Sequence, residues 1–218
     1  MKRIEDLQTH GLKFVQDDEL FCFGTDAVEL ANFAAPHKNS RVCDLGAGSG
    51  IISVLLAGKF GCKVTAVEIQ ERCCELIREN AAMNNLDIEA VNMPMQEFKG
   101  HFDGVICNPP YAKKGSGMGR ENESERIACT EEKVTFSEVA DCAARLLSTG
   151  GKFWVIHHVT RLAEVIAVLV GKRLEPKKLQ ILRPTDGKAP HLFMLECIRD
   201  GKTGITVLGE RTPRVYND

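Results

Sequence analysis

The sequence of 218 residues lacks the features that place a chain in a membrane, outside the cell or around a metal ion. No apolar run approaches the ~20 residues that a transmembrane helix needs. The first residues, MKRIEDLQTHGLKF, contain no apolar stretch of the signal-peptide kind. The nine cysteines form no Cys-x-x-Cys motif and no Cys/His cluster. We therefore expect a cytoplasmic protein with reduced thiols, no membrane association and no metal.

The composition also lacks the bias of disordered, collagen-like or disulfide-dense chains. Hydrophobic residues make up 44% and charged residues 27% of the chain, close to the averages of globular proteins. The length favours a single domain over 1–218, large enough to bury a substantial core. Cys43, Cys107 and Cys197 stand in apolar runs and are expected to be small buried hydrophobes.

A strong net charge of either sign is absent, since the formal net charge is −2. This argues against nucleic-acid binding through overall charge. However, residues 1–149 carry 16 basic and 23 acidic residues (net −7), whereas residues 150–218 carry 12 and 7 (net +5). The basic third is interpreted either as a surface for nucleic acid or as charge that protects edge strands from aggregation. Its cations include Arg161, Lys172, Arg173, Lys177, Lys178, Arg183 and Lys188.

Short apolar segments alternate with helical patterns from residue 41 onward. Strands are predicted at 41–45, 62–69, 88–93, 102–107, 152–159, 174–184 and 190–200, and helices at 25–35, 51–60, 70–85, 132–147 and 160–173. This alternation is typical of an α/β fold with a mainly parallel sheet, and the two consecutive last strands predict an antiparallel edge. Residues 1–40 should form an N-terminal capping segment, with Thr25 or Asp26 as the N-cap of its helix. Residues 112–132, rich in Gly, Ser and Glu, read as a long loop.

A glycine loop, DLGAGSG at 44–50, follows the first of the alternating strands and opens a helix. Ile51 stands where a dinucleotide fingerprint requires glycine, and the Gly-Lys-Ser/Thr of a P-loop is missing. Asp44 could accept a hydrogen bond from an ammonium group, which favours a zwitterionic ligand over a phosphate. Glu68, which ends the next strand, is placed to accept from ribose hydroxyls. This combination describes S-adenosylmethionine (SAM); the plainer alternative is a turn that closes an ordinary βα unit.

A second motif, Asn-Pro-Pro-Tyr, ends the strand predicted at 102–107. Two prolines stiffen the turn, because each fixes φ and lacks an N–H group. The amide oxygen of Asn108 and the carbonyl of Pro109 can both accept from an –NH₂ group, and Tyr111 offers a ring face for a planar base. The motif therefore suits transfer of a methyl group to a planar amine by positioning rather than by a strong base. A rigid turn without chemical role is the alternative.

The motifs DLGAGSG, VEI and NPPY resemble those of class I SAM-dependent methyltransferases that methylate amino groups. The resemblance extends over about 12–200. FGTDAV at 23–28, NPPYAKKGSG and the stretch from Ala143 to Pro184 resemble the bacterial tRNA N6-adenine methyltransferases that modify valine tRNA beside the anticodon. It implies a Rossmann-like fold with a seven-stranded, mostly parallel sheet, an antiparallel strand near one edge and helices on both faces.

The resemblance also implies roles for individual residues. The cofactor SAM would contact Thr25, Asp26, Asp44, Gly46, Gly48, Glu68, Met95 and Asn108. The methyl-transfer site would consist of Asn108, Pro109, Pro110 and Tyr111. Three departures from the family pattern matter, one of them a C-terminus, GERTPRVYND, that looks shorter than in relatives. Pro94 stands where relatives often place an acid, so adenine recognition would rest on the backbone of Met95 or on apolar contact. Cys129-Thr130 replaces an Arg-His pair, which weakens an RNA contact there.

Four cations in the predicted loop at 112–132 are candidates for binding substrate phosphates. They are Lys113, Lys114, Arg120 and Arg126, although Glu121, Glu123 and Glu125 in the same loop fit ordinary solvated charge equally well. His157 and His158 are adjacent in a predicted strand, so one is expected in the core and the other at the surface. Phe21 and Phe23 should lie near the cofactor.

Together these features predict an enzyme that transfers a methyl group from SAM to N6 of an unpaired adenine in tRNA. Substrate choice is expected to depend on the 112–132 loop and the basic C-terminal third. One rival is glutamine N5-methylation of release factors, which uses the same motif but normally adds a helical substrate-reading domain before the SAM loop; only about 40 residues precede the loop here. The other is a catalytically silent SAM- or RNA-binding module, against which the intact Asn108 and Tyr111 argue.

Overall fold

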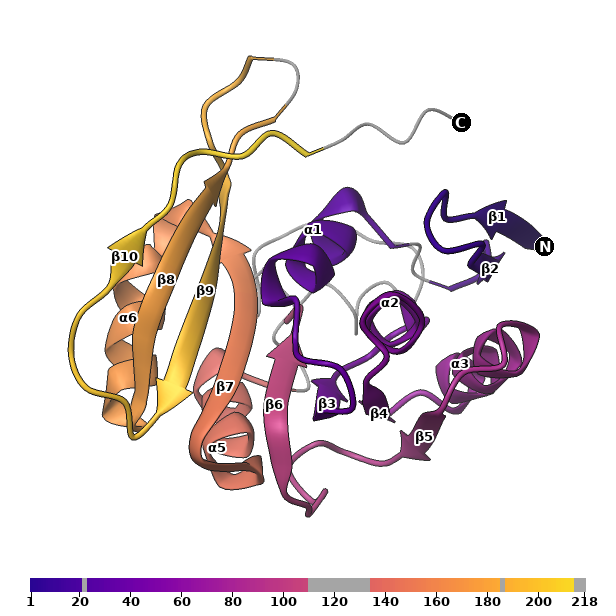
Figure 1. Cartoon of the computed structure of the whole chain (residues 1–218), viewed down its shortest axis with the longest axis horizontal. Coiled ribbons are helices and arrows are strands. Elements are labelled where there is room, and N and C mark those ends of the chain that lie inside the picture. The colour runs from indigo at the N-terminus through magenta and orange to yellow at the C-terminus, as the bar shows by residue number, and fades with distance from the viewer. Residues whose placement is uncertain (21–22, 110–133, 185–186, 214–218) are drawn as a thin grey trace.

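The computed structural model describes residues 1–20, 23–109, 134–184 and 187–213. Its centre is an eight-stranded sheet in the order β10-β8-β9-β7-β6-β3-β4-β5 (Figure 1). The strands are β3 (Arg41–Leu45), β4 (Lys63–Glu68), β5 (Ile88–Asn92), β6 (Phe102–Cys107), β7 (Leu147–His158), β8 (Leu174–Leu182), β9 (Leu192–Arg199) and β10 (Thr206–Val207). Only β9 runs antiparallel to its neighbours. The predicted α/β class and antiparallel strand near the edge are confirmed.

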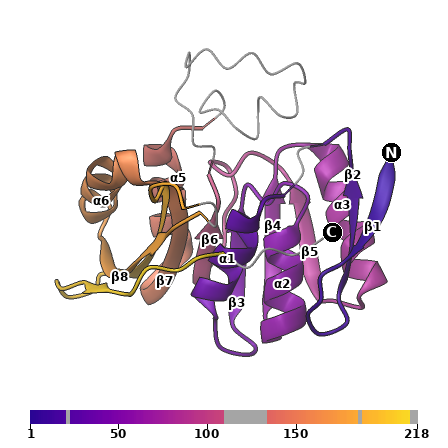
Figure 2. The same cartoon turned by 90° about the horizontal axis from the view of Figure 1, so that it is seen from above.

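Helices cover both faces of this sheet, as predicted (Figures 1 and 2). On one face α1 (Thr25–Ala34) and α2 (Ile51–Phe60) pack against alternate strand residues such as Val42 and Ile106. On the other face α5 (Phe136–Leu146) and α6 (Leu162–Gly171) pack against the intervening residues such as Cys43 and Val105. Because successive side chains of a strand point to opposite faces, each central strand contributes to both cores.

The N-terminal segment contains a hairpin that the sequence pattern did not predict. It consists of β1 (Lys2–Asp6) and β2 (Lys13–Asp17), which pair antiparallel beside α3 (Glu71–Met83). Asn80 of α3 accepts from the backbone N–H of Val15 at 2.6 Å and donates to its carbonyl at 3.1 Å. Asn84 makes the same pair of bonds with Lys13, at 2.9 and 2.7 Å. These two amides, here called the amide clamp, attach α3 to β2 as a neighbouring strand would.

Several predicted boundaries are corrected by the structure. The N-cap of α1 is Gly24, not Thr25 or Asp26, and no side chain caps that helix. The helix predicted at 132–147 starts at Phe136, because Thr135 and Glu138 form a capping box. Residues 148–151, which lie between the predicted helix and the predicted strand at 152–159, belong to β7. The short strand β10 raises the predicted seven strands to eight.

The buried polar residues mostly agree with the sequence analysis. His157 is fully buried between Phe136 and Phe193, and His158 is half-buried, as expected. Burial lowers the pKa of His157 to about 3, so this ring is neutral at physiological pH. Cys43, Cys107 and Cys197 are buried thiols, as predicted. In the described ranges, every helix falls short of the length and hydrophobicity needed to cross a membrane.

Candidate functional site

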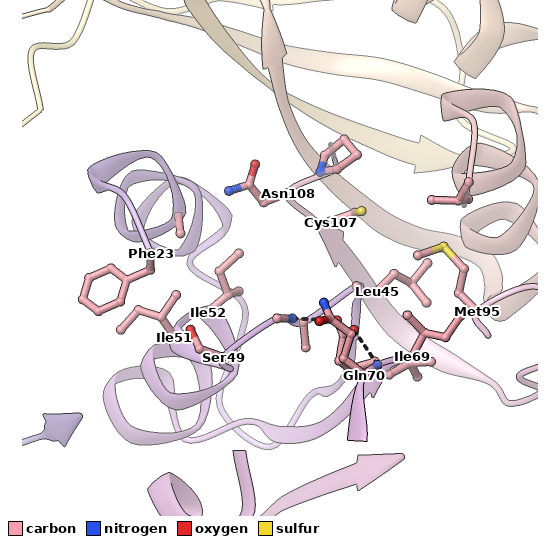
Figure 3. Close-up of a pocket in the computed structure, with 18 of the residues that line it drawn as sticks. Phe23, Leu45, Ser49, Ile51, Ile52, Ile69, Gln70, Met95, Cys107 and Asn108 are labelled. Carbon is pink, nitrogen blue, oxygen red and sulfur yellow. Dashed lines mark hydrogen bonds between the residues drawn. The ribbon is translucent and has the colours of Figure 1, made fainter. Parts of the chain in front are cut away.

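The site lies where the carboxyl ends of four parallel strands, β3, β4, β5 and β6, meet at one edge of the sheet. A pocket opens there, with the start of α1 on its other side (Figure 3). This edge is where open α/β sheets bind their ligands. The lining includes Phe23, Gly24, Gly46, Gly48, Glu68, Ile69, Met93, Pro94, Met95, Cys107, Asn108 and Pro109.

The glycine loop forms the floor between β3 and α2. Gly46, Gly48 and Gly50 have φ angles of +70°, +54° and +88°, a backbone conformation that favours glycine. At Gly48 a Cβ would meet nothing within 4 Å, so the backbone there faces open space. At Gly50 a Cβ would stand 2.7 Å from Cγ1 of Ile77, which explains the third glycine by packing rather than by ligand contact.

Asp44 lies beneath the loop and is not part of the lining. Its side chain is 1% exposed, and its Oδ2 accepts from the hydroxyl of Ser53 at 2.7 Å. Burial raises the pKa of Asp44 to about 7, with the nearby Glu68 carboxyl adding to the shift. Ser53 is the functional neighbour that the sequence analysis missed. The signal was present, because Ser53 is the single hydroxyl in the apolar helix IISVLLAG.

Glu68, at the end of β4, lines the pocket. Its two oxygens accept from the backbone N–H groups of Gly48 and Gln70, both at 2.9 Å. Burial raises its pKa, and these backbone bonds partly oppose the shift. The carboxylate thus joins the glycine loop to the residues after β4. Since an ionised carboxylate has about four acceptor positions, it can still accept from hydroxyl groups of a ligand.

The segment after β5 forms the opposite wall, and Pro94 and Met95 both line the pocket. Arg145 of α5 holds this segment by donating to the carbonyls of Met95 at 3.3 Å, Gln96 at 3.1 Å and Phe98. The wall is therefore apolar at its surface and fixed from behind. It suits the face of a flat, weakly polar ring.

Asn108 and Pro109 follow β6 directly and line the same pocket as the glycine loop; Figure 3 shows Asn108 near the start of α1. The amide nitrogen of Asn108 donates to Oδ2 of Asp26 at 3.1 Å, across 82 positions of sequence. Thr25 and Asp26 lie at the start of α1, and neither belongs to the pocket lining; Phe23 and Gly24 of the same segment do. The structure thus brings Asp26 to Asn108, a contact that the sequence did not reveal.

The remaining site predictions fall outside the described residues. These are Pro110, Tyr111, Lys113, Lys114, Arg120 and Arg126, with the 112–132 loop, Cys129-Thr130 and Phe21.

The cations of the basic third do not gather on one surface. Arg161, Arg183 and Lys188 lie at the edge that carries Asn108, whereas Lys172 and Arg173 precede β8 at the opposite edge. Most take part in ion pairs or bonds to carbonyls: Arg161 with Glu164, Lys172 with Asp141, Arg173 with Asp200, Lys178 with Glu196, Arg183 with Glu210, and Lys177 with the carbonyls of Lys202 and Gly204. Most of these pairs use acids of the same third, which the net +5 already counts, and only Asp141 lies outside it; the excess positive charge is thus divided between opposite edges of the sheet.

Comparison with known proteins identifies the family. The chain matches the family model "Methyltransferase small domain" over residues 23–173. It is 27% identical over 210 residues, 88% of each chain, to the tRNA1(Val) (adenine(37)-N6)-methyltransferase of Shewanella sp. (strain MR-4). Its structure is similar to a "predicted O-methyltransferase" from Agrobacterium tumefaciens, with a TM-score of 0.66 and 23% identity over 85% of this chain and 86% of that chain.

A further structure of the same fold holds the demethylated product of SAM. The geranyl diphosphate C-methyltransferase of Streptomyces coelicolor A3(2), solved with S-adenosyl-L-homocysteine, matches with a TM-score of 0.58 and 13% identity over 79% of each chain. The Rossmann-like methyltransferase fold expected from DLGAGSG, VEI and NPPY is confirmed. The chain, matched over 23–173, belongs to the methyltransferase small domain family.

Proposed function

We propose that this protein transfers the methyl group of SAM to N6 of an unpaired adenine in tRNA. The observation that carries the proposal is the placement of Asn108 and Pro109 across one pocket from the glycine loop and Glu68. The tRNA methyltransferase of Shewanella, similar over 88% of each chain, supports the same acceptor. Such an enzyme would work in the cytoplasm.

The pocket residues fit SAM in shape and chemistry. Gly46 and Gly48 leave room for the methionine end, and Glu68 keeps acceptor positions for the ribose hydroxyls. Ile69 and Met95 would cover the adenine ring of the cofactor from the two walls. Asp44, beneath the loop, would act at a distance, because an ionised carboxylate in a region of low dielectric attracts an ammonium group above it.

The acceptor adenine would enter between Asn108 and the segment before α1. SAM, when bound in the pocket, would supply an electrophilic methyl group, whose bond to sulfur would break as the N–C bond forms, and the N6 proton would pass to solvent. Asn108 Oδ1 and the Pro109 carbonyl would accept the two N6 hydrogens and so direct the nitrogen lone pair at the methyl group. The gain comes from positioning and fixed dipoles. Tyr111 would stack on the base, and Lys113, Lys114, Arg120 and Arg126 would contact phosphates.

The test supplies labelled SAM with total tRNA, or with release factors, to the purified protein. We expect label in tRNA, in an N6-methyladenosine that nucleoside analysis identifies. Asn108→Ala should lower kcat by about 100-fold or more while the dissociation constant of SAM stays within about 2-fold. Label in the release factors instead would support glutamine methylation, and SAM binding without any labelled acceptor would support a silent module; either result overturns the proposal.

A further inference from the structure

The bond between Asp26 and Asn108 has a direction that matters for an amide. A carboxylate accepts hydrogen bonds and donates none, so Asp26 can bond only to the nitrogen end of the Asn108 side chain. The distance from Nδ2 to Oδ2 is 3.1 Å. Figure 3 shows the amide nitrogen on the side of α1 and the oxygen pointing in another direction.

The proposed methyl transfer requires the orientation of the Asn108 amide that this bond selects. The final torsion of an asparagine side chain has two broad wells, which exchange the positions of oxygen and nitrogen. With the oxygen toward the acceptor amine, Asn108 accepts a hydrogen bond from the N6 amino group. With the two ends exchanged, its –NH₂ group would face another –NH₂ group, and the orientation of the lone pair would be lost.

Asp26 itself is held by a helix with several independent attachments. Ala27, Leu30 and Ala31 of α1 are buried in the core shared with α2. The buried Glu29 of the same helix pairs with Arg211 of the C-terminal segment. Since a group can orient another only if its own position is fixed, α1 is a suitable support for Asp26.

We propose that Asp26 is a positioning residue for methyl transfer, which holds the Asn108 amide with its oxygen toward the acceptor amine. The inference rests on the proposed function and gives Asp26 a role in catalysis rather than in cofactor binding. The negative charge has a second effect, because an amide that donates to a carboxylate becomes a stronger acceptor at its oxygen. That oxygen faces the amine as positive charge develops on it.

The kinetic test compares Asp26→Ala and Asp26→Asn with wild type. Loss of a charge-assisted bond should lower kcat about 10- to 100-fold for Asp26→Ala, with the dissociation constant of SAM and the KM for tRNA within about 2-fold. The kcat of Asp26→Asn should lie between those of wild type and Asp26→Ala, because the new amide oxygen still accepts a hydrogen bond from Asn108 but carries no charge. Asn32→Ala, on the same helix and bonded to Lys59, is the matched control and should keep the wild-type kcat.

A spectroscopic test does not depend on any acceptor. In ¹⁵N-labelled protein, the side-chain amide signal of Asn108, assigned by its disappearance in Asn108→Ala, should shift in Asp26→Ala and stay in place in Asn32→Ala. An unshifted signal, or a wild-type kcat in Asp26→Ala, would refute the inference, as would a loss of SAM affinity that accounts for the whole loss of activity. If wild type labels no tRNA, the proposed function fails, and the amide signal still decides whether Asp26 orients Asn108.

Discussion

Replacing Asp44 by asparagine is expected to make the protein more stable at neutral pH and a weaker binder of SAM. The folded structure raises the pKa of Asp44 from 3.8 to about 7, mainly through burial. Well below pH 3.8 the carboxyl is protonated in both the folded and the unfolded chain and has no effect on the free energy of unfolding. Above that pH the unfolded chain releases the proton first, so the free energy of unfolding falls as the pH rises toward 7.

The size of this effect follows from the two pKa values. A shift of about three units corresponds to about 4 kcal/mol, which is fully expressed near pH 8 and reduced to about 2 kcal/mol near pH 5. Asparagine has the shape of the protonated carboxyl and can still accept from Ser53, but it does not ionise. Asp44→Asn should therefore exceed wild type in unfolding free energy by an amount that grows by about 2 kcal/mol between pH 5 and pH 8.

Urea unfolding of both proteins at several pH values measures this difference directly. Subtracting the two curves removes the ionisable groups that do not interact with Asp44, and leaves the effect of Asp44 together with its coupling to the nearby Glu68. A difference that stays constant between pH 5 and pH 8 would refute the reasoning, because it would mean that Asp44 is ionised throughout. Calorimetric titration should show weaker SAM binding by Asp44→Asn at pH 8, where the wild-type carboxylate is charged.

Two further predictions concern stability. Asn80→Ala leaves the buried backbone N–H and C=O of Val15 without their bonds to the asparagine side chain and should lower the unfolding free energy by about 2–4 kcal/mol. Asn84→Ala, whose bonds lie near solvent, should lower it by under about 1 kcal/mol. Urea unfolding measures both losses, and equal losses would contradict the assigned burial. Gly50→Ala adds a steric clash to a φ of +88° and should cost at least about 2 kcal/mol, while Gly48→Ala, at +54° with open space around its Cβ, should cost about 1 kcal/mol. Equal melting temperatures for the two glycine variants would count against the clash.

The parts of the fold that could be predicted are those encoded by local pattern. The helix at 51–60 and the strand at 41–45 have the predicted bounds, because glycines bracket the helix and a continuous apolar run marks a buried strand. The hairpin was not predicted, because no local pattern marks it. One face of β2 is covered by α3, which lies about 60 positions later in the sequence, and the other contributes Phe14 to the main core. Both faces are therefore buried.

The site shows the same division. The sequence could predict three parts of the site, because each has a fixed position relative to a strand end: the glycine loop, Glu68 and Asn108. The contact between Asp26 and Asn108 spans 82 positions and depends on how α1 lies across the sheet, which no local pattern encodes. Net charge was a poor guide to the surface, because the basic residues of the C-terminal third find their counterions only in the folded chain.

The amide clamp has a consequence for how the N-terminal segment can vary. Both asparagines bond to main-chain atoms, so the clamp accepts any side chain on β2 as long as the strand stays extended. It does fix the register, because a slip by one residue would exchange Phe14, in the main core, with Val15, which faces α3. Phe23 packs edge-on against Phe14 and lines the pocket. The clamp itself thus constrains the length of chain between it and the pocket rather than the side chains of β2, which are constrained by their burial on both faces instead.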